Sequence, residues 1–223
     1  KNDSDVADET RKKIKSLLKN ERYYPNIHAA SLASKKKVKI IGLVFPKGAF
    51  LWADHYVVEI LRGVSQVVEE SEFKVMFFTR DQVETSMCFG LYKSGQVGGL
   101  ALVGISKSDY PMIKEIKKEK IPFVLLNSYC AGVDSFDCDN KLGGYIATRH
   151  LIKSGRKRIA FIHARKDWIS AIDRFEGYKK ALKQAGMTFR KDYVDFASFS
   201  TEEAELVTEK FLSLKQIPDA IFA

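Results

Sequence analysis

Two carboxylates lie two residues apart in the segment FDCDN, where Asp137 and Asp139 could form the acidic pair of a catalytic site. In an extended segment they would flank a single backbone turn. The neighbouring sequence supplies neither a nucleophile nor a set of metal ligands to act with them. We therefore assign neither residue to catalysis, and we expect Asp139 to order the turn before the following helix.

Histidine and cysteine chemistry is not indicated either. The four histidines never stand at metal-ligand spacing on one element, which predicts surface or packing roles, although the second and fourth fall near strand ends: His28, His55, His150 and His163. The cysteines are an odd number without C-x-x-C spacing, which predicts buried reduced thiols instead of disulfides or a zinc site: Cys88, Cys130 and Cys138. We predict no metal and no cofactor.

Motifs for nucleotide and acyl chemistry are absent from the sequence. No G-x-G-x-x-G follows the first predicted strand, no G-x-x-x-x-G-K-[ST] occurs, and the pair Gly98-Gly99 begins a strand instead of following one. The G-x-S-x-G elbow of α/β hydrolases is also missing. We therefore predict that the protein is not an enzyme, and an enzyme on an α/β scaffold stays a minor alternative.

The elements that must position a site alternate between short apolar runs and segments of helical period. Strands are expected at Val38–Phe45, Lys74–Thr79, Gly98–Val103, Pro122–Leu126, Arg158–Ile162 and Ala220–Phe222. Helices are expected at Asp54–Ser71, Gln82–Lys93, Asp109–Glu119, Leu142–Lys153, Ser170–Ala185 and Thr201–Leu214. This alternation predicts an α/β fold of doubly wound parallel sheets. Their ligands bind outside the carboxyl ends of the strands, at the loops Pro46–Ala53, Thr79–Asp81, Gly104–Lys107, Asn127–Asp134 and His163–Ile169.

The composition is that of a globular chain. Of its 223 residues, 45% are hydrophobic and 12% aromatic, which is enough to form a core in one large or two smaller domains. No run approaches the roughly 20 apolar residues of a membrane span, and the N-terminal residues have no apolar stretch typical of a signal peptide. We expect a cytoplasmic protein with no membrane partner.

Positive charge is concentrated near the N-terminus. The formal net charge is +9, and residues 1–37 carry ten Lys and Arg against five Asp and Glu. A basic arm of this kind favours a polyanionic partner such as nucleic acid. Within the arm, Asp8–Asn20 has the pattern of a charged amphipathic helix.

The segment YYPNIHAASLASKKK has the pattern of a very short helix. Pro25 suits a first helical turn, and the cations of Lys35–Lys37 suit the negative end of a helix. A helix of about eight residues is below the roughly 12 to 15 at which isolated helices become marginal, so it needs a partner to form. Leu32 is a large apolar group that could pack on the core or meet such a partner. A surface for close packing of a second helix is left by three small residues: Ala29, Ala30 and Ala33.

An ordered series of blocks now identifies a family. The chain resembles the lactose-repressor/galactose-repressor (LacI/GalR) family of bacterial transcription regulators in ADETRKKI, YYPNIHAASLASKKKVKIIGLVFP, VVEILRGV, IPFVLLN, DNKLGGYIATRHLIKSGRKRIAFI and RFEGYKKAL. The resemblance implies a helix-turn-helix headpiece, a hinge helix and a two-lobed, periplasmic-binding-protein-like core that forms a homodimer. By resemblance, residues 1–37 are a partial headpiece with the hinge helix at about 25–33, residues 38–154 the N-terminal lobe, and residues 155–223 an incomplete C-terminal lobe.

Operator DNA is the partner that the resemblance implies. In the family, the leucine that matches Leu32 is wedged between base steps from the minor groove, and the lysines beside it can neutralise phosphates. The positions expected to contact DNA are Asn26, Ala29, Leu32, Lys35, Lys36 and Lys37. Because only the third headpiece helix can be placed, we expect this chain by itself to bind DNA poorly.

A small-molecule effector, a sugar or related metabolite, is expected between the lobes. Arg174 in DRFEG matches the arginine that contacts effector in the family, and its fork of donors suits vicinal hydroxyls or a carboxylate. The alternative is an exposed ion pair with Asp173 or Glu176. Ser170, one helical turn earlier, matches another contact position, and Trp168 could stack on a sugar ring or be a surface aromatic.

The first lobe contributes a second set of expected effector contacts. Tyr56 and Val57 match a pair of positions where the family usually has aromatics, and only Tyr56 keeps the ring. Phe50 or Trp52, in the loop before them, could replace the missing stacking surface.

Asn127 and Ser128 stand where sugar binders of this type often have Asp-Arg. Two neutral groups thus replace a charge pair, which argues against a standard pentose or hexose pocket. The leading hypothesis remains a ligand-responsive DNA-binding repressor, in which effector closes the lobes and changes operator affinity through paired hinge helices. A solute-binding protein of periplasmic type shares the two-lobed core and is the alternative, but it predicts a secretory signal and no basic arm.

Overall fold

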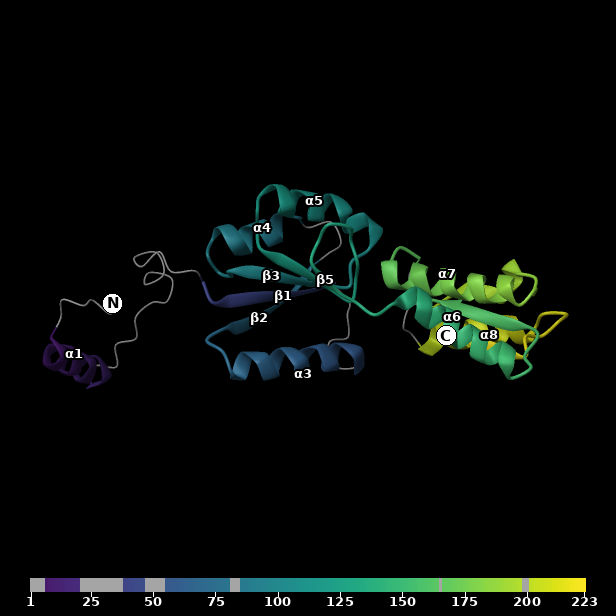
Figure 1. Ribbon diagram of the computed structural model, residues 1–223, viewed down its shortest axis with the longest axis horizontal. Coiled ribbons are helices and arrows are strands. Elements are labelled where there is room, and N and C mark those ends of the chain that lie inside the picture. The colour runs from purple at the N-terminus through teal and green to yellow at the C-terminus, as the bar shows by residue number, and fades with distance from the viewer. Residues whose placement is uncertain (1–6, 21–37, 47–54, 81–84, 165, 198–200) are drawn as a thin grey trace.

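The computed structural model describes residues 7–20, 38–46, 55–80, 85–164, 166–197 and 201–223. This part of the chain forms α1 (Asp8–Asn20) and two α/β halves, each built on its own parallel sheet (Figure 1). None of its helices is long and apolar enough to cross a membrane. The predicted hinge helix and several predicted contact residues lie outside the described residues: Asn26, Ala29, Leu32, Lys35, Lys36, Lys37, Phe50 and Trp52.

The first half contains a five-stranded parallel sheet with the strand order β2-β1-β3-β4-β5. The strands are β1 (Ile40–Pro46), β2 (Lys74–Arg80), β3 (Gly99–Val103), β4 (Phe123–Leu126) and β5 (Ser135–Phe136). The helices are α3 (His55–Glu69), α4 (Thr85–Lys93), α5 (Tyr110–Lys118) and the short 3-10 helix η1 (Lys107–Asp109). The strand order reverses between β1 and β3, so a switch point of the doubly wound type lies at their carboxyl ends.

Side-chain alternation divides the core of this half into two layers. In β1, Val44 packs into the cluster formed with α4 and α5, whereas Leu43 and Phe45 pack against α3. Figure 1 shows α4 and α5 on one face of the sheet and α3 on the other. Because helices cover both faces, the central strands are apolar at nearly every position, which is the pattern that predicted them.

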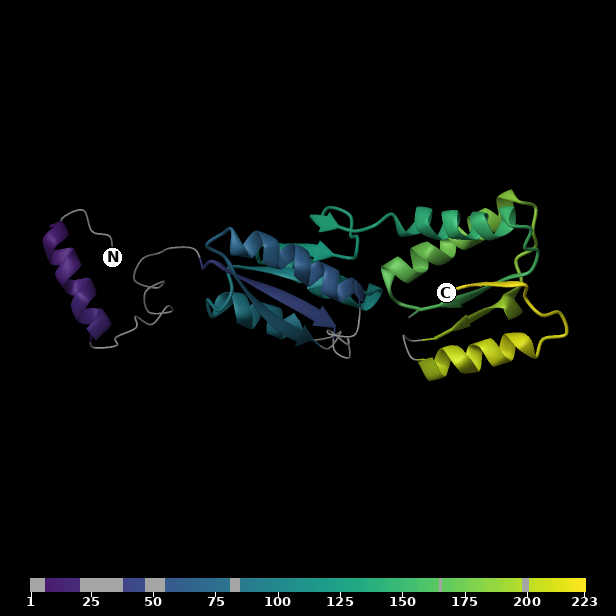
Figure 2. The same ribbon diagram turned by 90° about the horizontal axis from the view of Figure 1, so that it is seen from below.

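The second half contains a three-stranded parallel sheet with the strand order β7-β6-β8. Its elements are α6 (Asn140–Lys153), β6 (Ile159–His163), α7 (Ile169–Gln184), the 3-10 helix η2 (Lys191–Tyr193), β7 (Val194–Phe196), α8 (Thr201–Leu212) and β8 (Ala220–Phe222). Ile159 and Phe161 pack against Tyr178 and Leu182 of α7, and Ala160 packs against α8. Figure 2 shows α7 and α8 on opposite faces of the sheet.

Helix α6 packs in the second half, beside α7, although the sequence placed residues 38–154 in the first. The two backbones touch: a Cβ atom on Gly144 would lie 2.1 Å from the carbonyl oxygen of Arg174, and one on Gly177 would lie 2.2 Å from that of Lys141. The chain therefore passes between the halves at residues 137–139, directly after β5 (Figure 1). The predicted boundary differs by one helix because the alternation of strands and helices does not say which sheet a helix covers.

Candidate functional site

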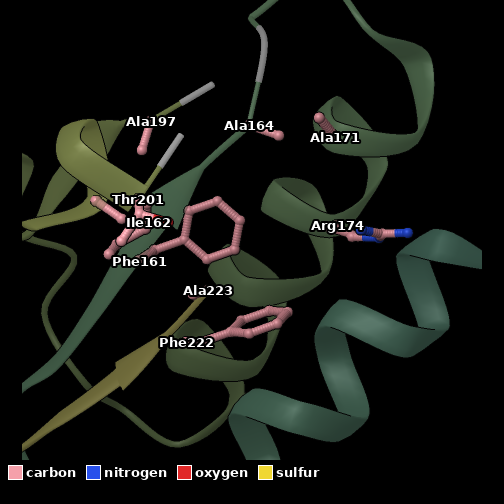
Figure 3. A pocket seen from close by; sticks show the side chains of 10 residues that line it. Phe161, Ile162, Ala164, Ala171, Arg174, Ala197, Thr201, Phe222 and Ala223 are labelled. Atoms are coloured by element: carbon pink, nitrogen blue, oxygen red, sulfur yellow. The ribbon is translucent and has the colours of Figure 1, made fainter. Parts of the chain in front are cut away.

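A cavity of about 330 Å³ opens at the carboxyl edge of the second sheet, where β6, β7 and β8 end and α7 and α8 begin. The residues around it are shown in Figure 3: Phe161, Ile162, Ala164, Ala171, Arg174, Ala197, Thr201, Ala204, Phe222 and Ala223. Parallel α/β sheets bind their ligands at this edge. A mostly apolar cavity with a few polar groups is also the usual form of a small-molecule site.

The lining combines two aromatic rings with two polar side chains. The rings of Phe161 and Phe222 face the cavity, whereas the side chain of Arg174 lies at its rim and extends toward α6 (Figure 3). Thr201, at the start of α8, supplies a hydroxyl. Aromatic rings beside a fork of N–H donors suit a ligand that has an apolar face and neighbouring oxygen atoms, as a sugar ring has.

Arg174 makes a single hydrogen bond within the described part of the chain. Its Nε donates to Oδ1 of Asn140 at 2.9 Å. The alternative ion pair with Glu176 is not formed, because Glu176 pairs with Lys179 at 2.6 Å between Oε1 and Nζ. The terminal nitrogens of Arg174 therefore have no acceptor among the described residues, and they are available to a ligand.

The loops at the carboxyl edges of the two sheets touch each other. The N–H of Lys107 donates to the carbonyl oxygen of Asp167 at 3.0 Å, and Ser106 forms an antiparallel bridge with Trp168. Gly104 has a φ of +56°, and a Cβ atom there would lie 4.0 Å from Cη2 of Trp168. The predicted aromatic thus reaches across to the first half, and the loop after β3 meets the loop after β6.

Ser128 and Asn127 form hydrogen bonds that join loops at the carboxyl edge of the first sheet. The Ser128 hydroxyl is buried, and its Oγ accepts the N–H of Ile105 at 2.7 Å. Asn127 has a φ of +53°, and its N–H donates to the carbonyl oxygen of Phe136 at 2.9 Å. Both residues lie at the strand edge where effector contacts were predicted, but these two hydrogen bonds stabilise the loops themselves.

The other predicted effector residues fall in three settings. Tyr56 lies in the first turn of α3 and is 38% exposed. Val57 is buried in the cluster between α3 and the sheet, so its side chain serves the core. Ser170 is buried in the first turn of α7. The structure therefore groups Ser170 and Arg174 near the start of α7, beside Trp168, and separates Val57 from them.

Asp137 and Asp139 shape the turn into α6. Oδ1 of Asp139 accepts the N–H of Leu142 at 2.8 Å, so the prediction that Asp139 orders this turn is confirmed. Oδ1 of Asp137 accepts the N–H of Cys138 at 2.8 Å and the Nδ2 donor of Asn140 at 3.0 Å. Across the described ranges, no group of three or more His, Cys, Asp or Glu side chains is placed to hold a metal ion.

His163, at the end of β6, is a packing residue among aromatic rings. Its ring meets that of Phe161 edge to face, with centroids 5.6 Å apart, and lies 5.3 and 5.0 Å from the rings of Phe175 and Phe196. Nδ1 lies 2.9 Å from the carbonyl oxygen of Ala164, which can only accept, so Nδ1 carries the proton. Burial lowers the pKa of His163 below its ordinary value.

We expect acid to destabilise the fold through His163. As pH falls from 7.5 to 5.5, the unfolded chain takes up a proton on this residue before the folded chain does, so the free energy of unfolding falls by up to about 1.4 kcal/mol per pH unit. Urea unfolding at both pH values should give a smaller pH difference for His163→Phe than for the wild type. His150→Gln, at an exposed position on α6, serves as the control. Equal pH differences for His163→Phe and the wild type would contradict this account.

Comparison with known proteins identifies the class. Residues 39–223 match the family described as periplasmic binding proteins and sugar binding domain of the LacI family. The chain belongs to this family, as the resemblance predicted.

Regulators of the same family are similar over most of the chain. The HTH-type transcriptional regulator MalR of Streptococcus pneumoniae is 34% identical over 206 residues, which cover 91% of this chain and 62% of MalR. The HTH-type transcriptional regulator CelR of Thermobifida fusca is 28% identical over 223 residues, which cover 98% of this chain and 65% of CelR. The chain thus spans less than two thirds of the length of these relatives.

Solved structures confirm the fold. A structure described as a transcriptional regulator CelR-cellobiose complex superimposes with a TM-score of 0.74 at 26% identity, covering 99% of this chain and 66% of that one. A LacI family transcriptional regulator from Mycobacterium smegmatis has a TM-score of 0.67 at 27% identity, covering 81% of this chain and 66% of that one. The predicted periplasmic-binding-protein-like α/β fold is therefore correct.

Proposed function

We propose that the chain is part of a sugar-responsive transcriptional repressor, which binds a small effector between its two halves and operator DNA through its N-terminal segment. The cavity at the carboxyl edge of the second sheet, with Arg174 at its rim, is the observation that carries this proposal. Its support comes from the family match, from relatives named as transcriptional regulators, and from a similar regulator solved with cellobiose.

The effector would act on DNA affinity through the placement of the two halves. A ligand in the cavity would contact α7 and the loop after β6, whose Asp167 and Trp168 are joined to the loop after β3. A ligand that binds one placement better than another shifts the population toward it. The N-terminal segment continues directly into β1, so that shift would alter how it meets DNA, and DNA would alter effector affinity by the same factor.

The remaining partners follow from this function. We propose that the protein binds its effector without converting it chemically and is therefore not an enzyme. We also propose that it binds DNA in the cytoplasm and that it forms a homodimer. A subunit contact is supported by apolar side chains that are exposed on α3, on the edge strand β2 and in the turn between them: Val67, Phe73, Met76 and Phe77.

A sugar screen followed by DNA binding tests the proposal. Cellobiose, maltose, trehalose and their monosaccharides are added to the protein during thermal unfolding. A sugar at about 100 times its Kd should raise the free energy of unfolding by about 2.7 kcal/mol and the Tm by about 5 to 10 °C. The same sugar should change, by severalfold, the affinity of the full-length gene product for DNA from upstream of its own gene.

Salt dependence separates the repressor from the alternative. Affinity for that DNA should fall steeply between about 50 and 200 mM salt, because lysines that neutralise phosphates release counterions. A sugar that stabilises the protein but leaves DNA affinity unchanged would favour a solute-binding protein of periplasmic type. No stabilisation by any sugar in the screen would remove the effector half of the proposal.

A further inference from the structure

Asn140 is buried at the first position of α6, where the chain enters the second half. Its amide makes three hydrogen bonds. Nδ2 donates to Oδ1 of Asp137 at 3.0 Å and to the carbonyl oxygen of Cys138 at 3.1 Å, and Oδ1 accepts Nε of Arg174 at 2.9 Å. One side chain therefore joins the crossover between the halves to the arginine at the rim of the cavity.

The surroundings of Asn140 fix which way its amide points. The oxygens of Asp137 and Cys138 can only accept, and Nε of Arg174 can only donate. A flipped amide would place its oxygen against two acceptors and its NH₂ group against a donor. Only the observed orientation satisfies all three partners, so the amide cannot turn without losing the whole set.

The backbones of α6 and α7, which carry the two ends of this connection, are in direct contact. Gly144 meets the carbonyl group of Arg174, and Gly177 meets that of Lys141, at distances that admit no side chain. Asn140 lies one helical turn before Gly144. The first turns of α6 and the middle of α7 are therefore in direct backbone contact beside the crossover. Figure 3 shows the Arg174 side chain extending from α7 toward α6.

We propose that Asn140 is a positioning residue, which holds Arg174 by its Nε so that the guanidinium offers only its terminal nitrogens to the effector, and which ties this arginine to Asp137 in the crossover between the halves. The inference deepens the proposed function and rests on it for the contact between Arg174 and effector. It goes beyond that contact because it assigns the residue that orients the arginine and the segment to which the arginine is joined.

This arrangement narrows the class of ligand. With Nε already occupied, the two terminal nitrogens present parallel donors to a pair of adjacent oxygens, as in a carboxylate or a vicinal diol. The rings of Phe161 and Phe222 face the cavity at whose rim Arg174 lies, and they suit the apolar face of a ring. The structure assigns to the site a ligand that carries both features, a pyranose diol or a sugar acid.

The charges at the crossover make it responsive to Arg174. Burial raises the pKa of Asp137, and the negative charge of Asp173 raises it further. The hydrogen bonds from Cys138 and Asn140 lower this pKa in part, as does the positive charge of Arg174. Burial also raises the pKa of Asp173, with Asp139 and Glu176 adding to it and Lys141 opposing it. A ligand that draws the guanidinium charge toward itself would change the balance felt by the crossover carboxylates.

The first test follows the N–H group at Nε of Arg174 by ¹H–¹⁵N NMR, with its signal assigned by its loss in Arg174→Gln. In the wild type this proton should be protected from exchange. Asn140→Leu has a side chain of nearly the same size and no acceptor, so exchange should become about tenfold faster. Asp139→Asn is the matched control: asparagine caps helices as well as aspartate does, and the Arg174 signal should not change.

The second test follows the carboxyl of Asp137 by ¹³C NMR titration. Its pKa should rise further in Asn140→Leu, which removes a hydrogen bond, and in Arg174→Gln, which removes a cation. Asn140→Asp keeps an acceptor for Arg174 but places an oxygen against Asp137, so it should leave the Arg174 proton protected while raising the pKa of Asp137. This variant keeps the inference testable if Asn140→Leu does not fold.

Two outcomes would overturn the inference. An Arg174 proton that exchanges equally fast in the wild type and in folded Asn140→Leu would show that Asn140 does not hold the arginine. If the pKa of Asp137 were the same in Arg174→Gln as in the wild type, the arginine would not be coupled to the crossover. Neither test uses a sugar or DNA, so failure of the proposed function, seen in the sugar screen, is distinguishable from failure of this inference.

Discussion

Gly144→Ala is expected to destabilise the second half by about 3 kcal/mol, because the methyl group would meet the carbonyl oxygen of Arg174 at 2.1 Å. That atom belongs to the backbone of α7 and cannot move aside as a side chain can. Relief requires α6 and α7 to separate, and separation breaks the bond from Arg174 to Asn140. Urea unfolding followed by circular dichroism should show the transition at a much lower denaturant concentration.

The adjacent residue supplies the control. A Cβ atom on Gly143 would have no atom within 4 Å, and the residue lies in the same turn of α6. Gly143→Ala should leave stability unchanged or raise it by about 0.5 to 1 kcal/mol, since alanine is the better helix former. If the two alanines had equal effects, the close contact of α6 with α7 would not exist in solution.

The strands of the core were predictable because burial on both faces leaves a simple signal. β1 and β3 were expected from continuous apolar runs, and the structure places them side by side in the first sheet. β5 (Ser135–Phe136) and β7 (Val194–Phe196) were not predicted. Each lies at a sheet edge, has two or three residues and includes a polar one, so neither shows a period of two or an apolar run.

The placement of α6 was missed although the sequence carried a clue. Glycine is unfavourable inside a helix, and Gly143-Gly144 and Gly177 both stand within predicted helices. A small residue in a helix permits close packing, so the pattern predicts that each of these two helices packs closely against another element. The sequence pattern does not show which helix packs against α6, because the contact between residues 144 and 174 depends on the path of the intervening chain.

The candidate site was predictable only in outline. Arg174 and the loop before α7 were identified, and the structure places both at the carboxyl edge of the second sheet. Val57 was misplaced because matching a position in a resemblance does not reveal which side of a helix faces the sheet. Asn140 was missed because its function lies in contact with Arg174, 34 residues away, and its sequence neighbours suggest only a helix start.

Arg174→Ala is expected to abolish the stabilisation by sugar while leaving the protein folded. Two hydrogen bonds from a charged donor are lost, each worth about 1.5 to 3 kcal/mol, so the Kd should rise by at least about a hundredfold. At the sugar concentration that is about 100 times the wild-type Kd, the Tm shift should then nearly vanish. The side chain is exposed and makes no ion pair among the described residues, so the fold loses chiefly its bond to Asn140. Isothermal titration with the sugar selected by the screen measures the change.

Arg149→Ala is the matched control, because it removes the same charge from an exposed position on α6, where the guanidinium lies 5.9 Å from the centroid of the Tyr145 ring. It should bind the sugar as the wild type does. Arg174→Lys keeps the charge but lacks the fork of donors, so it should resemble Arg174→Ala if paired hydrogen bonds matter and the wild type if charge alone matters. Unchanged affinity in Arg174→Ala would mean that the apolar wall binds the ligand without the arginine, and the cavity would then have to be reassigned to a ligand without adjacent oxygens.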